Sequence, residues 1–478
     1  MKAALLTFVA AIAVAQAKVT SAVLRELELE GSSDVFIALT DSAPVLESIP
    51  ESNSPSIVRE ALVQHATTSQ KEALELLREQ SVTTSWIANA IICKGCPQDL
   101  VQKVSALKSV VSVSKLPVVE VPSTFMGETS GQKEGTNEWG VETVGAPKVW
   151  PYYNGKGATV GSIDTGAYYK HEAIAANFRA EKGWFDAFNK SIASPDDIDG
   201  HGTHTIGTMV GNNGIGVAPG AQWISCRGLM NGKGSAETLL ACAEFMLCPT
   251  DVDGKNPDCK KAPNVINNSW GGSSNDLWFK SAAAAWIKAG IIPVFSNGNS
   301  GPACATVGNP GFLPNVISVG ALGSWTTDSP VDLAFFSSKG PAVFMGRNGK
   351  PYAVVKPDIA APGFFTRSAY IPPAQYANMA GTSMAAPHVA GVVALLKAAK
   401  SDLTYKEVYQ YVTNYAYQKD LTPEPATWIG KANATLPGAP NCGEVKDSVW
   451  PNNRYGYGRI DASNMFDGGD IKPPKPAC

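Results

Sequence analysis

The stretch ATVGSIDTG, residues 158–166, carries the clearest structural signal in the chain. Residues 158–163 are small or apolar almost throughout, which is typical of a strand buried on both faces of a parallel sheet. Asp164 ends this run. Because ligands of open α/β sheets bind at the carboxyl ends of the strands, the pattern places a carboxylate where function is expected. An aspartate that ends a strand is often only a turn residue, so Asp164 needs partners before it can be assigned a role.

Further segments of the same kind follow and are separated by helical patterns. The short apolar runs are residues 222–226, 264–268, 291–295 and 316–319. The helical stretches between them include residues 235–248 and 277–289. This alternation predicts an α/β domain with a mostly parallel sheet flanked by helices.

Two Gly-rich segments carry the other reactive side chains. The segment DGHGTHT, residues 199–205, leads into a helical stretch and contains His201 and His204. Their spacing suits a zinc-binding pair, but no third ligand is evident, so packed histidines are the plainer interpretation. The segment GTSMAAPHVAG, residues 381–391, puts Ser383 at a helix start, where a serine is often only an N-cap.

Taken together, these residues have a chemical meaning that each lacks alone. Asp164, His201 and Ser383 stand in the chain order of one known nucleophilic triad. A serine hydroxyl becomes a good nucleophile when an imidazole takes its proton and a carboxylate orients that imidazole. An esterase of the α/β-hydrolase fold is the rival, but it requires G-x-S-x-G and the order Ser, Asp, His, and neither fits.

The region of residues 138–463 resembles the subtilisin-like serine peptidases. Three motifs carry the resemblance, namely DTG at 164–166, HGTH at 201–204 and GTSMAAPH at 381–388. It implies a subtilisin-like fold and an endopeptidase that hydrolyses peptide bonds through an acyl-enzyme on Ser383. His201 would be the base and Asp164 would hold its tautomer, whereas His204 and His388 match structural histidines. This chemistry requires no cofactor.

The resemblance also suggests the groups that stabilise the oxyanion. Residues 298–301, GNSG, are similar to the family's Gly-Asn-x-Gly, so we expect the side-chain amide of Asn299 to be the donor. Asn297 is its rival, two residues away. The backbone N–H of Ser383, at a helix start, is the expected second donor.

Substrate is expected to add a strand beside Ser269, Trp270 and Gly271, which resemble the family's substrate-binding strand. Gly308 lies in a segment that resembles the wall of the pocket for the residue before the cut. Because glycines leave space and no acid occurs in these stretches, we expect this pocket to accept a large apolar side chain, narrowed by Trp270. Ordinary core packing is the alternative role for Trp270.

The first part of the chain predicts two processed segments. Residues 1–17 contain Lys2, an apolar run of about 13 residues and a small-residue pattern at 15–17, which is the order of a secretory signal peptide. Residues 18–128 show a β-α-β-α-β order, with strands expected over residues 34–40, 85–93 and 110–121. This order resembles a small α+β ferredoxin-like module and the family's inhibitory propeptide. We therefore expect a secreted zymogen that is cut in the polar connector of residues 122–138. Residues 129–478 then form the catalytic domain with a short Pro-rich tail.

Composition limits the partners. The 478 residues include 39 Lys and Arg against 42 Asp and Glu, for a net charge of −3. With no excess of positive charge to neutralise phosphates, nucleic acid is not expected as a partner. No later stretch predicts a membrane span. We expect a monomer whose partners are protein or peptide substrates and its own propeptide, which acts as an intramolecular inhibitor.

Cysteines, metal and glycan sites are less determined. We expect Cys248 to pair with Cys259 and Cys226 to be an unpaired core thiol. Cys93 and Cys96 have the spacing of a redox or zinc pair, but we expect them to form a structural disulfide or to remain free. A structural calcium ion is left open, because Ala173 replaces an acid that many family members use. The acidic cluster DDID at residues 196–199 is either a cation site or a solvated turn. Sequons for N-glycosylation occur at Asn189, Asn267 and Asn433, and Asn267 is expected to be buried.

Two alternatives to the endopeptidase remain from the sequence. One is a catalytically inactive homologue that acts as a binding protein, against which the intact triad residues and Asn299 count. The other is an exopeptidase of the same fold, because a blocked end of the cleft is not visible in a sequence.

Overall fold

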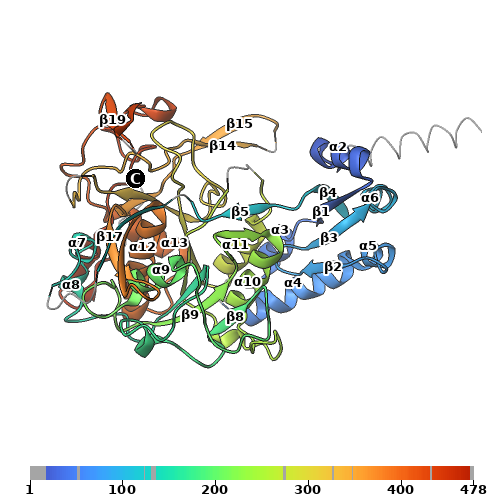
Figure 1. Cartoon of the computed structure of the whole chain (residues 1–478), viewed down its shortest axis with the longest axis horizontal. Helices are drawn as coiled ribbons and strands as arrows, with labels where there is room; N and C mark the ends of the chain where they lie inside the picture. The colour runs from blue at the N-terminus through green and yellow to red at the C-terminus, as the bar shows by residue number, and fades with distance from the viewer. Residues whose placement is uncertain are drawn as a thin grey trace, which may run out of the picture.

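The computed structural model describes residues 18–50, 54–122, 124–130, 136–272, 276–325, 328–346, 348–430 and 433–473. The predicted signal peptide therefore lies outside the described residues. The described chain forms a large α/β domain with a smaller α+β module beside it (Figure 1).

The large domain is built on a seven-stranded sheet with the order β16-β13-β12-β11-β7-β9-β8. Every neighbouring pair in it is parallel, as predicted. Its strands are β7 (Thr159–Asp164), β8 (Trp184–Asp186), β9 (Gln222–Arg227), β11 (Val265–Asn268), β12 (Ile292–Ser296), β13 (Ile317–Leu322) and β16 (Ile359–Pro362). The pattern of apolar runs identified five of these strands and missed the short β8 and β16.

Helices cover both faces of this sheet. The helices α9 (His201–Val210) and α12 (Thr382–Ala399) pack on one face, and α10 (Ala236–Leu247) and α11 (Lys280–Lys288) pack on the other (Figure 1). Alternate residues of a strand point to opposite faces, so Val160 of β7 joins the first core and Ile163 joins the second. The helix α13 (Tyr405–Asn414) adds to the first core.

Residues 18–115 form the smaller module, with the sheet order β2-β3-β1-β4. Its elements are α2 (Ser21–Glu30), β1 (Ser32–Leu39), α3 (Ala43–Ser48), α4 (Pro55–Ser69), α5 (Lys71–Leu76), β2 (Val82–Ser85), β3 (Ala90–Pro97), α6 (Gln98–Ser105) and β4 (Val110–Lys115). The order βαββαβ of β1, α4, β2, β3, α6 and β4 is ferredoxin-like, as predicted.

Two details of this module differ from prediction. The single strand expected over residues 85–93 is a hairpin, because residues 86–89, with Asn89 at a positive φ of 47°, turn the chain between β2 and β3. The strand expected over residues 110–121 is also divided, since its last part, β5 (Val118–Glu120), leaves the module and pairs with β10 (Lys233–Ser235) of the large domain. Beyond it, β6 (Phe125–Ser130) joins β18 (Tyr376–Ala380) and β17 (Thr366–Ala369).

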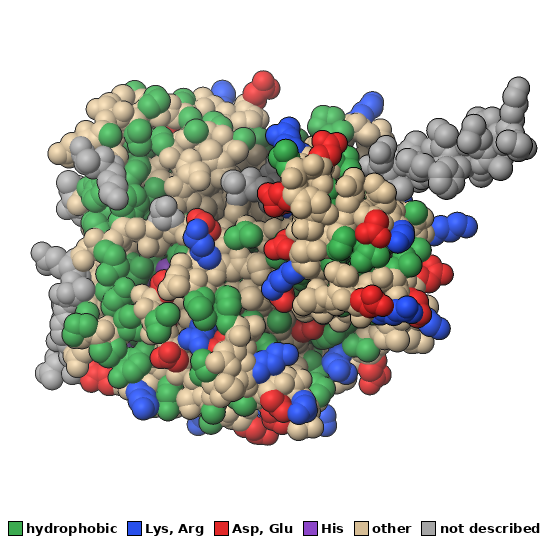
Figure 2. All heavy atoms as spheres, turned by 45° about the vertical axis from the view of Figure 1, so that its right-hand side comes forward, with side chains coloured by type: hydrophobic (Ala, Val, Ile, Leu, Met, Phe, Trp, Pro, Cys, Tyr) green, Lys and Arg blue, Asp and Glu red, His purple; other side chains and the backbone are tan. Residues whose placement is uncertain are grey.

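The module docks on the sheet face that α10 and α11 cover. Apolar residues of α4 and β3 share one buried cluster with these two helices. Figure 2 shows acidic and basic side chains interspersed on the face of the molecule that carries the module.

Smaller elements complete the chain. They are α7 (Trp139–Thr143), α8 (Ala146–Val149), β14 (Ala342–Met345), β15 (Pro351–Val354), β19 (Thr427–Ile429), β20 (Thr435–Pro437), β21 (Phe466–Asp467), β22 (Asp470–Ile471) and short 3-10 turns at 175–177, 259–261, 442–444 and 462–465. Among the described residues, α12 has the length and composition of a membrane span, but 89% of it is buried inside the protein.

The disulfides correct one prediction. Cys248 pairs with Cys259, as expected. Cys226 is not a free thiol, because it is bonded to Cys242. Cys226 is the last residue but one of β9, and its side chain faces α10. This contact between a strand and the helix that covers it cannot be seen in the sequence. The third bridge joins Cys304 to Cys442.

Candidate active site

Asp164 is the last residue of β7 and is fully buried. Its backbone oxygen accepts hydrogen bonds from the N–H groups of Gly228 and Leu229. Its Oδ1 accepts a 2.7 Å hydrogen bond from the N–H of Thr165 and lies 2.7 Å from Nδ1 of His201. The carboxylate is therefore held rigidly against the imidazole.

His201 is the first residue of α9 and is 1% exposed. The helix approaches β7 closely because Gly202 has no side chain: a Cβ there would lie 2.2 Å from the oxygen of Gly166. Burial lowers the pKa of His201, but the charge and hydrogen bond of Asp164, helped by two further acids, outweigh it, and the pKa is raised. The ring is thus poised to take up a proton.

Ser383 lies in the first turn of α12, which packs beside α9. Its Oγ donates a 3.1 Å hydrogen bond to the backbone oxygen of Ser269. Among the described residues, Nε2 of His201 has no hydrogen-bond partner and is buried. The hydroxyl is therefore turned away from the imidazole in this state, while the nitrogen that would accept its proton is unoccupied.

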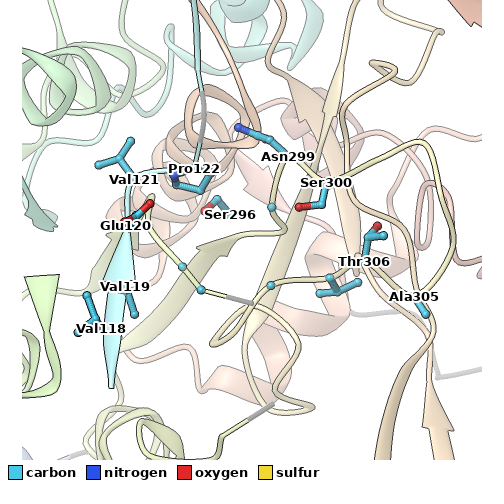
Figure 3. Close-up of a pocket in the computed structure, with 15 residues that line it drawn as sticks. Val118, Val119, Glu120, Val121, Pro122, Ser296, Asn299, Ser300, Ala305 and Thr306 are labelled. Carbon is cyan, nitrogen blue, oxygen red and sulfur yellow. The ribbon is translucent and has the colours of Figure 1, made fainter. Parts of the chain in front are cut away.

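Asn299 follows β12, at the same edge of the sheet. Its Oδ1 accepts hydrogen bonds from N and Oγ1 of Thr382, at 2.9 and 2.8 Å. Because the amide oxygen is engaged in this way, the amide nitrogen points toward the side on which Pro122 lies, two residues after β5 (Figure 3). Asn297, the rival, is fully buried, donates to Ser338 and accepts from Ser318. Asn299 therefore remains the expected donor. The N–H of Ser383, in the first turn of a helix, lacks an intrahelical acceptor and suits the second donor.

The chain's own residues 118–122 lie in the cleft as an added strand. Glu120 and Gly271 exchange two backbone hydrogen bonds of 3.0 Å, and the N–H of Val121 donates to the oxygen of Gly232 at 2.8 Å. On its other edge the strand pairs with β10. This is the geometry of an extended peptide held by main-chain hydrogen bonds from both sides.

A cavity of about 780 Å³ lies beside this strand. Figure 3 shows residues 118–122 along one side of it and Ser296, Asn299, Ser300 and Thr306 on the other. Gly271 and Gly308 line the cavity, as the sequence predicts. The other lining residues are Gly272, Gly298, Ala305 and Val307.

The other two residues predicted for substrate binding act differently. Ser269 is fully buried, and its Oγ donates a 2.9 Å hydrogen bond to the backbone oxygen of Ser383, so it joins the substrate strand to the nucleophile turn. Trp270 is fully buried and packs edge-to-face against Phe279 and Phe295. It does not line the cavity. The expectation that it narrows the pocket is wrong; its ring belongs to the core.

Asp197 is a site residue that the sequence did not single out. Its Oδ1 accepts from Thr165 Oγ1 and from the N–H groups of Asp199 and Gly200, and its Oδ2 accepts from N and Oγ1 of Thr203, all within 3.0 Å. This buried carboxylate therefore ties the loop after β7 to the first turn of α9. The signal was an acid four residues before the HGTH motif, hidden among its acidic neighbours.

We expect Asp197→Ala to reduce kcat about 10- to 100-fold with little change in KM, because a small displacement of a reacting group has effects of this order. Asp196→Asn is the matched control, since that side chain is half exposed and lies 3.6 Å from Arg227. Steady-state kinetics on a peptide substrate measure both. A folded Asp197→Ala protein with unchanged kcat would exclude the positioning role.

The acidic cluster does not look like a cation site. Both oxygens of Asp197 are occupied by protein donors, as described above. Among the described residues, no group of three or more His, Cys, Asp or Glu side chains could hold a metal ion.

The two other histidines of the sequence motifs, His204 and His388, have structural surroundings. His204 is fully buried and its Nε2 faces the backbone oxygens of Thr366 and Ala377, and burial lowers its pKa to about 3. His388 is buried, and its pKa is lowered to about 4 by burial. Both rings are neutral near pH 7, as expected of structural histidines.

Comparison with known proteins agrees with this geometry. A profile of the subtilase family matches residues 155–458. Bacillopeptidase F of Bacillus subtilis is 38% identical over 350 residues, which are 68% of this chain and 22% of that protein. Serine protease AprX of B. subtilis is 34% identical over 288 residues, covering 54% of this chain and 61% of AprX. Thermitase of Thermoactinomyces vulgaris is 32% identical over 267 residues, 55% of this chain and 82% of thermitase. The chain thus spans less than two thirds of the length of the first two relatives.

The family match covers more than half of the chain and includes the strand that ends in Asp164, the helix that begins with His201 and the turn that carries Ser383. The parallel sheet and its flanking helices agree with it. The chain belongs to the subtilase family, the subtilisin-like serine peptidases.

Proposed function

We propose that the protein is a serine endopeptidase that hydrolyses peptide bonds through an acyl-enzyme on Ser383. The observation that carries this proposal is the buried 2.7 Å contact between Asp164 Oδ1 and His201 Nδ1, with Nε2 of the same ring left without a hydrogen-bond partner among the described residues. A peptide bound like residues 118–122 presents its backbone to this group.

The proposed steps follow from the positions of these groups. The Ser383 hydroxyl rotates from the Ser269 oxygen to Nε2 of His201, which takes its proton as Oγ attacks the peptide carbonyl. The negative oxygen is stabilised by the amide of Asn299 and the N–H of Ser383. His201 returns the proton to the leaving amine, and water then repeats the sequence on the ester.

Digestion of a peptide library by the mature protein, with the cuts mapped by mass spectrometry, tests this proposal. Internal cuts are expected, preceded by large apolar side chains, because Gly271 and Gly308 line the cavity and its lining side chains from the large domain carry no charge. Cuts confined to the ends of peptides would indicate the exopeptidase. No cuts from a folded protein would indicate an inactive binding homologue.

We further propose that residues 18–128 are an inhibitory propeptide. Support comes from β5, which occupies the cleft in place of a substrate, and from the docking of the module on α10 and α11. A signal peptide at residues 1–17 and secretion fit this arrangement, and one relative, 36% identical over 217 residues, is named minor extracellular protease Vpr. Asn189 and Asn433 are exposed and suit glycan attachment, whereas Asn267 is buried, as predicted.

Glu244 of α10 is the polar centre of the docking surface. Its Oε1 accepts hydrogen bonds from Ser85 Oγ and from the N–H groups of Trp86 and Ile87, at 2.9, 2.8 and 3.3 Å. Burial raises the pKa of Glu244 to about 7, against the opposing effects of these hydrogen bonds and of the positive charge of Arg59. The carboxyl group thus holds a proton more strongly when the module is docked.

This pKa predicts how propeptide release depends on pH. The ordinary pKa of a glutamate is 4.5 and that of docked Glu244 is about 7, so docking takes up a proton between these pH values, and its stabilising contribution is complete below pH 4.5. The contribution is lost as the pH rises through 7. We expect the ratio of release rates, wild type over Glu244→Gln, to rise roughly tenfold from pH 6 to pH 8.

Both proteins share the pH dependence of catalysis, so the ratio of their release rates cancels it. Release is followed by gel electrophoresis of the full chain. Glu244→Gln keeps an acceptor oxygen without a titrating proton, whereas Glu244→Ala removes the acceptor and is expected to release faster at every pH. A ratio that stays constant with pH would contradict the proposed role of Glu244.

A further inference from the structure

Cys93 and Cys96 share one face of β3, although their spacing would place them on opposite faces of a regular strand. The register explains this: Ser33 of β1 lies opposite Cys96 and Val35 opposite Cys93, with an irregularity between them. Two residues of β3 therefore stand against one residue of β1, which is a β-bulge. The extra residue brings both thiols to the same side of the sheet.

The bulge is built by the sequence between the two cysteines. Gly95 has a φ of 58°, a left-handed conformation that favours glycine. Its N–H donates a 2.7 Å hydrogen bond to Oδ1 of Asp34, the residue of β1 that the bulge spans. Lys94 and Gly95 are exposed, so the loop that joins the two buried thiols faces solvent.

The two thiols touch each other in the core of the module. Both are fully buried in one apolar cluster, and neither belongs to the bridges described above. A hydrogen bond from Cys96 lowers the pKa of Cys93. Cys93 is therefore the better nucleophile of the pair, and Cys96 is placed to resolve a bond formed on it.

The loop between the two thiols reaches the docking surface, although the thiols themselves lie in the module's own apolar core. Lys94, between the cysteines, places Nζ 2.5 Å from Oε2 of Glu237 on α10. Oε1 of Glu237 accepts a 2.8 Å hydrogen bond from Thr83 of β2. The conformation of the bulge therefore determines a contact between the module and the large domain.

We propose that Cys93 and Cys96 form a reversible dithiol–disulfide pair whose oxidised state holds the module more firmly on the large domain. In the oxidation, Cys93 as thiolate attacks an external disulfide such as oxidised glutathione and releases one glutathione thiolate. Cys96 then attacks the mixed disulfide as a thiolate, forms the Cys93–Cys96 bond and releases the second glutathione thiolate. Two protons leave the protein, and the two-electron oxidation of the pair is balanced by reduction of the external disulfide.

The covalent part is tested on the full chain carrying Ser383→Ala, which remains unprocessed. The protein is incubated with oxidised or reduced glutathione, denatured, alkylated and analysed as peptides by mass spectrometry. After oxidised glutathione, we expect Cys93 and Cys96 to escape alkylation and the peptide that contains both to be lighter by two hydrogens. Complete alkylation, or glutathione retained on either cysteine, would refute the proposal that Cys93 and Cys96 form a disulfide. This result does not depend on the proposed peptidase function.

The regulatory part rests on the proposed function and uses the chain with Ser383 intact. We expect the lag before propeptide release to be roughly three- to tenfold longer after oxidised than after reduced glutathione, because closing a ring stabilises the module against unfolding. Cys93→Ser/Cys96→Ser should show one lag in both conditions, which also controls for effects on the other bridges. If this variant does not fold, Cys96→Ala serves instead, since it cannot close the ring. Equal lags in the wild-type chain would overturn the coupling, whereas absence of any release would count against the peptidase and leave the covalent result standing.

Discussion

Replacing Ser383 with alanine is expected to lower kcat about 10⁵- to 10⁶-fold and to leave the chain uncut between residues 18–128 and the large domain. The expected reduction in kcat is that known for replacement of the corresponding serine of subtilisin, a member of the same family. The reason is specific to the structure. Ser383 is the hydroxyl at the start of α12, and its neighbour Ser269 is committed to hydrogen bonds with the backbone of Ser383 and with Asn267. No neighbouring group can replace the lost nucleophile.

The measurement is hydrolysis of a fluorogenic peptide together with gel electrophoresis of the purified chain. Ser401→Ala is the matched control, because Ser401 is exposed and only its backbone oxygen accepts a hydrogen bond. It should behave as the wild type. A Ser383→Ala protein that is processed and digests peptides normally would refute the proposed function.

Asp164→Asn is expected to reduce kcat about 10⁴-fold, the order found when this carboxylate is neutralised in other triads. The amide keeps the volume of the side chain but not its charge. Because Oδ1 of Asp164 faces both the N–H of Thr165 and Nδ1 of His201, an NH₂ group in that position loses the hydrogen bond from Thr165 and favours the wrong tautomer of His201, with the proton on Nε2. The base would then be unable to accept the serine proton.

The same substitution should move the pH profile. Catalysis requires neutral His201, so activity rises as the pH passes the pKa of His201. That pKa is raised by Asp164 beyond the lowering effect of burial. Removing the negative charge should therefore shift the acid limb of kcat/KM to lower pH. Profiles measured from pH 4 to 9 test this, and an acid limb that stays in place would show that Asp164 does not act on His201.

Local sequence was sufficient for much of the fold and for the reactive groups. The run before Asp164 predicted a buried parallel strand, because only a strand covered on both faces is apolar at successive positions. Asp164, His201 and Ser383 were recognised because each lies in a short motif with glycine at a close approach. The contact of Gly202 with Gly166 shows why that spacing is required.

Other features arise from contacts between segments that are distant along the chain. Asp197 looked like one acid among several until the structure showed its oxygens joining two loops. Trp270 looked like part of the pocket wall, yet its ring packs in the core. Successive residues of an extended segment face opposite sides, so Trp270 need not face the pocket that Gly271 lines. Cys226 looked like a lone core thiol, although α10 places Cys242 against it.

The sequence by itself determined the family, the parallel sheet and the identity of the triad residues, because these depend on short motifs and on strand periodicity. Only the tertiary structure decided that the cleft is occupied by β5, that Glu244 caps the hairpin of the N-terminal module, and that a bulge brings Cys93 to Cys96. The physical reason is the same in each case. Such contacts depend on which faces of strands and helices meet, and a shift of one residue in register changes the face that a side chain occupies.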